Sequence, residues 1–141
     1  MKNINYAINV FNVFVRSYKD DYKIVALESL KYDTALQNEL KTSLGTDNFD
    51  SLVEFYYNDL IKTDLLDKKF TEDEINSILD MSLPISDQLI YKMLYYQLAL
   101  IHDIDSVDDI RAGLSNAGYD PFQLSKDDWN NIYNMKNVID F

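Results

Sequence analysis

The chain of 141 residues contains no cysteine, one histidine, three glycines and two prolines. Without cysteine there is no disulfide, no thiol nucleophile and no cysteine-ligated zinc site. A single imidazole excludes a zinc site built from several histidines. Neither GxxxxGK nor GxGxxG occurs, so the glycine-rich phosphate loops of these types are absent. We therefore expect a protein that is not an enzyme and that carries no cofactor.

Positive charge is also scarce in this sequence. Lys and Arg number 13 against 24 Asp and Glu, which gives a formal net charge of −11. Direct binding of DNA, RNA or an anionic membrane needs clustered Lys and Arg, so we expect neither nucleic acid nor membrane as a partner. An excess of carboxylates favours fast association with basic proteins instead.

Long hydrophobic runs are missing as well. The longest nearly apolar run covers residues 89–101 and contains Lys92 and Gln97, whereas a membrane-spanning helix needs about 20 apolar residues. The first residues lack the pattern of a secretory signal. We expect a cytoplasmic protein, and the bias toward Asn, Lys, Ile, Asp and Tyr is typical of AT-rich coding sequences of bacteria and their phages, which suggests a bacterial host cell.

Apolar and aromatic residues are abundant. Hydrophobic residues make up 47% of the chain, with 11 Tyr, 7 Phe and one Trp. This composition supplies a real core and is unlike that of disordered chains. Apolar residues recur at helical spacing, and no stretch alternates convincingly over six positions as a strand does. We predict an all-α fold: one acidic helical domain over residues 1–141, packed as a compact bundle of about seven or eight short helices.

Capping residues mark the predicted helices of the first half. Apolar residues at helical spacing predict helices over residues 4–18 and 22–30. Asp33 is placed to cap the next helix, which should stop at Gly45 because glycine accepts left-handed backbone geometry. A further helix is predicted over residues 49–61.

The second half carries the clearer helix signals. Thr71 and Glu74 have the spacing of a capping box, and Pro84 should end the helix that they start. Residues 87–102 are apolar on nearly all sides, which indicates the helix buried at the centre of the bundle. Serines are predicted to cap the last three helices: Ser86, Ser106 and Ser125.

The segment "HDIDSVDDI", which begins at His102, holds five residues that could bind a metal. A calcium loop that started at Asp103 would need an oxygen ligand at Val107, a glycine at Asp108 and a glutamate at Leu114. The pattern fails at all three positions, so we expect no metal site. His102 is interpreted as a polar residue at the C-terminal end of the central helix, not as a catalytic group.

The negative charge is concentrated in the second half of the chain. Residues 1–69 hold 11 acids and 9 bases, whereas residues 70–141 hold 13 acids and 4 bases. Eight of those 13 acids lie in the first turn of a predicted helix, where the helix dipole stabilises them. The dipole does not explain the missing bases. If the helix starts converge, ten carboxylates form a binding face: Glu72, Asp73, Glu74, Asp80, Asp103, Asp105, Asp108, Asp109, Asp127 and Asp128.

Such a face predicts a protein that works by protein–protein binding. Our first hypothesis is a stoichiometric inhibitor of a basic nucleic-acid-binding effector such as a nuclease, comparable to phage anti-defence proteins of the anti-CRISPR type, with the carboxylates imitating a nucleic-acid backbone. An immunity protein that neutralises a cognate bacterial toxin fits the same pattern. A structural or assembly module that self-associates through an aromatic surface is the third hypothesis. The sequence leaves the oligomeric state open.

Overall fold

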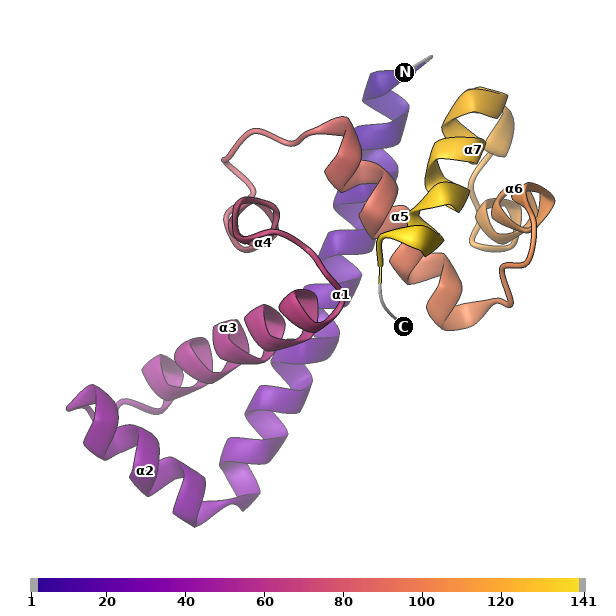
Figure 1. The fold of residues 1–141 in the computed structure, drawn as a ribbon. Coiled ribbons are helices and arrows are strands. Elements are labelled where there is room, and N and C mark those ends of the chain that lie inside the picture. The colour runs from indigo at the N-terminus through magenta and orange to yellow at the C-terminus, as the bar shows by residue number, and fades with distance from the viewer. Residues whose placement is uncertain (1–2, 140–141) are drawn as a thin grey trace.

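The computed structural model describes residues 3–139, and all regular secondary structure in this range is helical. This confirms the predicted all-α fold and the number of helices (Figure 1). The elements in chain order are α1 (Ile4–Tyr32), α2 (Thr34–Leu44), α3 (Phe49–Asp67), α4 (Glu72–Leu79), α5 (Asp87–Ile101), α6 (Val107–Asn116), the 3-10 turn η1 (Pro121–Gln123), α7 (Lys126–Asn134) and the 3-10 turn η2 (Met135–Asn137).

Helix α5 forms the centre of the larger part of the molecule, as predicted. It packs against α1, α6, α7 and η2. Nine of its residues are buried, and they lie on all sides of the helix, which is why its sequence shows no polar stripe. The side chains of Ile90, Met93 and Leu94 are almost completely enclosed.

The predicted break within the first helix is wrong, because α1 is continuous from Ile4 to Tyr32. No glycine or proline occurs in this range, so nothing interrupts the backbone hydrogen bonds. The polar stretch that suggested a break places Asp20 and Asp21 on the exposed side of the helix. The Asn3 side chain accepts the backbone N–H of Tyr6 and so caps the first turn.

Helix capping follows the sequence at most of the predicted positions. The side chains of Asp33, Ser86 and Ser125 accept backbone N–H groups at the starts of α2, α5 and α7. Gly45 ends α2 with φ +67°, in the left-handed region that glycine tolerates. Two C-terminal boundaries differ from the prediction. Helix α3 runs on to Asp67, and α4 ends at Leu79, before Pro84.

The helices bury two separate hydrophobic clusters. The smaller one holds α1, α2 and α3 together through Ala26, Leu30, Leu40, Leu52 and Val53. We call residues 23–60 the arm, since these helices extend away from the rest of the molecule toward the lower left of Figure 1. The other described residues, 3–22 and 61–139, enclose the larger cluster and are called the body. Helices α1 and α3 run through both parts and join them.

Candidate functional site

Two of the ten acids predicted to bind a partner are buried. Glu74 is 8% exposed and Asp128 is 2% exposed. The Glu74 carboxylate lies 2.6 Å from the Lys92 ammonium and also accepts the backbone N–H of Thr71 in the capping box. Asp128 accepts the hydroxyl of Tyr91 at 2.8 Å and the backbone N–H of Ser125 at 3.0 Å. These two carboxylates hold the body together, so their predicted place on a binding face is corrected.

The remaining eight acids do not share one face. Glu72 and Asp73 start α4 and Asp80 follows its last residue, whereas the others belong to the α5–α6 connection, α6 and α7. In Figure 1, α4 lies on one side of α5 and the pair α6 and α7 lies on the other side. The expected convergence of the helix starts is therefore wrong. The reason is topological: α3 leads directly into α4, which lies on the side of α5 away from α6 in Figure 1.

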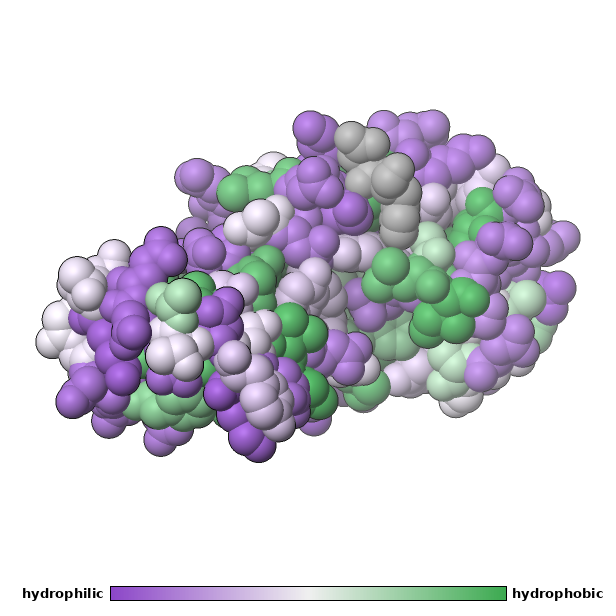
Figure 2. All heavy atoms as spheres, turned by 90° about the horizontal axis from the view of Figure 1, so that it is seen from below, coloured by the Kyte–Doolittle hydropathy of each residue, from purple (hydrophilic) through white to green (hydrophobic). Residues whose placement is uncertain are grey.

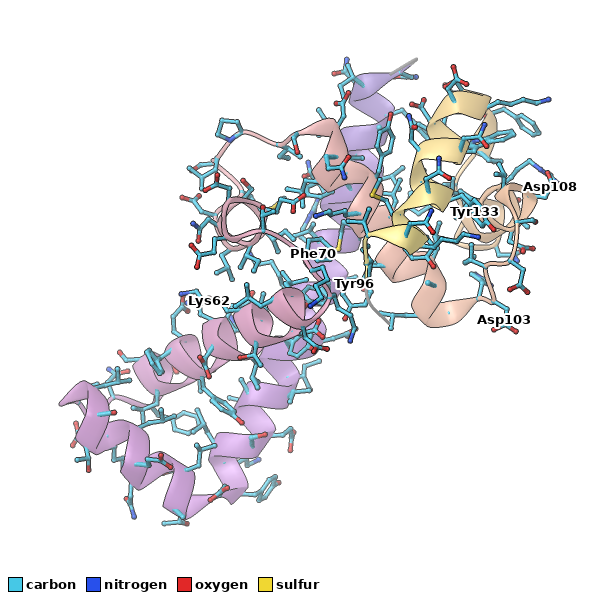
Figure 3. The ribbon with its side chains drawn as sticks, viewed as in Figure 1. Lys62, Phe70, Tyr96, Asp103, Asp108 and Tyr133 are labelled. Carbon is cyan, nitrogen blue, oxygen red and sulfur yellow. The ribbon has the colours of Figure 1, made fainter. Side chains whose placement is uncertain are left out.

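One group of exposed carboxylates does lie close together in the chain. We call Asp103, Asp105 and Asp108 the acidic rim. Asp103 and Asp108 are labelled in Figure 3, where both lie at the right-hand edge of the body, on the outside of the α5–α6 connection and α6. Neither Asp103 nor Asp105 forms an ion pair with another described residue. Arg111 approaches Asp108 at 3.9 Å, but both side chains are exposed, and such a pair contributes about 0–1 kcal/mol.

Asp109 has a different role from the acidic rim. Its carboxylate accepts the backbone N–H of Asp105 at 2.8 Å and that of Ser106 at 3.0 Å. These hydrogen bonds, that of Asp105 foremost, lower the pKa of Asp109 below its usual value. Asp109 therefore caps the start of α6 and shapes the connection that presents the acidic rim.

The connection is fixed by contacts on both of its sides. Helix α6 approaches α5 closely at Gly113, where no side chain intervenes. A Cβ atom added at this position would come within 3.1 Å of the Leu98 side chain and 3.4 Å of the His102 ring. On the other side the Tyr133 hydroxyl of α7 donates to the backbone carbonyl of Asp105 at 3.0 Å. Lys136 is hydrogen-bonded to the same hydroxyl. The acidic rim is thus held on a supported segment.

The last turn of α5 adds exposed hydrophobic residues next to the acidic rim. Leu100 is 56% exposed and Ile101 is 73% exposed, although Leu98 in the same turn is buried. Figure 2 views the molecule from below, the direction in which this end of α5 points in Figure 1, and shows a green hydrophobic patch on the body among purple residues. The sequence gives no sign of this exposure, because Leu100 and Ile101 continue the apolar pattern that predicts burial of the whole of residues 87–102.

A second polar cluster lies where the arm meets the body. The Asp64 carboxylate of α3 accepts the hydroxyls of Tyr18 at 2.5 Å and Tyr96 at 2.6 Å. Burial and the hydrogen bond to Asp64 raise the pKa of both tyrosines well above the usual value. The hydroxyls therefore stay protonated and act as donors, which suits a structural joint between α1, α3 and α5.

Residues 3–139 contain neither a group of metal ligands nor a membrane-spanning helix. Within this range no three His, Asp or Glu side chains come together in a way that could hold a metal ion. His102 ends α5, and its backbone N–H donates to the Leu98 carbonyl at 2.9 Å. No helix among the described residues is both long enough and apolar enough to cross a bilayer.

Comparison of the chain with protein-family models, with curated proteins and with solved structures gives no match.

Proposed function

We propose that this protein is a stoichiometric inhibitor that binds a basic, nucleic-acid-binding protein, such as a nuclease of a bacterial defence system, in the manner of phage anti-defence proteins. The observation that carries the proposal is the acidic rim. Its three aspartates are exposed, and of the three Asp108 alone has a weak ion pair with a described residue, Arg111. Carboxylates in this state attract a basic groove and compete there with a phosphate backbone.

The structure narrows the surface that such an inhibitor would use. A standard interface covers about 800 Å² per partner, roughly a tenth of the 7948 Å² surface of this chain. The acids of α4 and those of the α5–α6 connection lie on different sides of α5, so one partner of ordinary size would not cover both groups. We assign the contact to the acidic rim, since it is backed by exposed apolar residues of α5.

The proposal is tested by affinity capture from extracts of the host cell at about 50 mM and about 500 mM salt, conditions between which the Debye length falls from roughly 14 Å to roughly 4 Å. We expect the captured protein to be basic, to bind nucleic acid, and to be released at high salt. Purified, it should lose nucleic-acid binding at one equivalent of inhibitor. A captured toxin with these properties would point to the immunity role instead of anti-defence.

Charge-reversal variants locate the surface. In the first variant Asp103, Asp105 and Asp108 are changed to lysine. In the control Glu72 and Asp73, which are also exposed and lie at the start of α4, are changed to lysine. We expect the first variant to lose binding by about 100-fold or more and the control by less than about tenfold, because a screened charge on the opposite side contributes little. The proposal would be contradicted if the partner were captured equally well at both salt concentrations. It would also be contradicted if both variants lost binding affinity to the same extent.

A further inference from the structure

No residue in the described range 3–139 covers the hydrophobic end of α5. Leu100 and Ile101 occupy the last two positions of α5, and more than half of each side chain is exposed. Single exposed apolar residues are ordinary on protein surfaces. Two adjacent ones at the end of a helix form a small exposed apolar surface on the body.

Charged residues directly follow this surface in the chain. Asp103 and Asp105 are both exposed, and Asp108 starts the next helix. An apolar centre with a charged border has the layout of a protein interface, in which a few anchors supply most of the binding energy and the rim supplies orientation and speed of association. The exposed end of α5 and the acidic rim, which follow one another in the chain, have this composition.

The charge of the border decides what can cover the apolar centre. In a symmetric pair of copies, the aspartates of both chains would face each other across the contact, and like charges brought together cost free energy. An anionic lipid surface is repelled for the same reason. A basic protein is attracted by the rim and also covers the apolar residues, so it is the occupant that fits both parts of the surface.

We propose that Leu100 and Ile101 are the hydrophobic anchor of the interface, inserted into an apolar pocket of the basic partner, with the acidic rim facing lysines or arginines around that pocket. This inference rests on the proposed function and adds that charge alone is insufficient for binding. The anchor is supported from behind, because the His102 N–H to Leu98 carbonyl bond closes the helix and α6 packs against the same turn. A supported anchor loses little conformational freedom when it binds.

The anchor is tested with a defined probe, an amphipathic helical peptide made of leucine and lysine. A peptide of the same charge with serine in place of leucine is the reference. Binding is followed through the backbone amide signals of the isotope-labelled protein by NMR. We expect the leucine–lysine peptide to shift signals of residues 98–109 and to bind about tenfold more tightly than the serine–lysine peptide, since removing an apolar anchor commonly weakens binding to about this extent.

A matched pair of variants separates the anchor from general hydrophobicity. Leu100→Ser combined with Ile101→Ser removes the anchor. Ile24→Ser combined with Val25→Ser removes two arm residues that are 59% and 49% exposed. The first variant should bind the leucine–lysine peptide about tenfold more weakly, and the control should bind it as the wild type does. Both pairs are exposed, so thermal unfolding should confirm that both variants are folded.

The inference fails if the peptide shifts signals mainly in the arm, if both variants lose affinity equally, or if the two peptides bind alike. The same variants applied to the captured natural partner distinguish this failure from failure of the proposed function. Loss of capture on charge reversal, with full capture by the Leu100→Ser/Ile101→Ser variant, would overturn the anchor and leave the inhibitor role in place. Full capture by both variants would overturn both proposals.

Discussion

The arm and the body differ in what holds their helices together. The arm is closed by five buried apolar residues, and no charged side chain is buried within it among the described residues. The body has a much larger apolar cluster and also encloses Glu74, Lys92 and Asp128. Buried polar groups are stable only with their partners in place. The body is therefore specified by polar pairing as well as by packing, whereas the arm depends on packing and on the continuity of α1 and α3.

This difference also explains where the candidate interface lies. The acidic rim and the anchor belong to the body, on a connection that α6 and α7 hold in place. A site on such a supported segment keeps its geometry better than a site on a weakly packed extension.

The strongest expected loss of stability comes from breaking the buried ion pair of the body. Lys92→Met leaves the Glu74 carboxylate buried without its cation, and it removes the bond from the Lys92 ammonium to the Lys69 carbonyl. Removing one partner of a buried pair costs about 3–5 kcal/mol. Urea unfolding of the variant should therefore show a free energy of unfolding lower by this amount.

A double variant is the control for this pair. In Lys92→Met combined with Glu74→Gln, no unpaired charge is left, and the glutamine oxygen can still accept the Thr71 N–H that closes the capping box. Replacing both members of a buried pair by uncharged groups is often close to neutral. The double variant should recover most of the lost free energy of unfolding, and a loss equal to the sum of both single variants would show that the charges act independently.

The arm should respond to core truncation by opening on its own. Leu30→Ala removes a fully buried side chain from the small cluster of the arm, and we expect a cost of about 2–3 kcal/mol, near the low end for such changes. Hydrogen exchange should become faster in α2 while α5 and α7 keep their protection, because α2 packs mainly against α1 and α3. Leu94→Ala, at the centre of α5, is the matched change in the body and should raise exchange throughout the molecule.

The sequence contained most of the information for the individual helices. Capping side chains such as Asp33 and Ser86 and the left-handed Gly45 act within a few residues, so local patterns predict them. The central helix was predicted because its apolar residues lie on all sides. The continuity of α1 was missed, since polar residues between two apolar stretches look alike whether they form a loop or the exposed side of a helix.

The arrangement of the site depended on tertiary structure, which helical periodicity does not encode. The sequence places acids at helix starts but gives no direction for α4 relative to α6. The expectation that the ten carboxylates share one face is therefore wrong. Whether Asp128 is exposed depends on Tyr91, a residue of another helix. The exposed anchor was missed for the same reason. Leu100 and Ile101 resemble the rest of α5 in hydrophobicity, but α6 packs against Leu98 and His102 of this turn and leaves Leu100 and Ile101 exposed.

The joint between arm and body should be weakened by removing one hydroxyl from it. Tyr18→Phe keeps the ring, which packs against Tyr22 and Tyr96, and deletes the hydrogen bond to Asp64. A hydrogen bond to a charged group contributes about 1.5–3 kcal/mol. Because the Tyr96 hydroxyl still donates to the Asp64 carboxylate, the loss in free energy of unfolding should be near the lower value. Urea unfolding measures the cost. Tyr32→Phe, an exposed tyrosine of the arm, should leave stability unchanged.

The smallest expected effect is a pH dependence that belongs to the body. The pKa of Asp109 is lowered by hydrogen bonds from Asp105 and Ser106, and that of Asp80 by those from Ser82. A carboxylate with a lowered pKa in the folded state stabilises the fold above its unfolded pKa of about 3.9, and this contribution is lost as the pH falls through the folded value. The free energy of unfolding should therefore decline below about pH 4. Asp109→Asn should be less stable than the wild type at pH 6, and the difference should shrink toward pH 2 because the variant no longer titrates at this position. A profile for Asp109→Asn parallel to that of the wild type would show that the start of α6 does not depend on the charged cap.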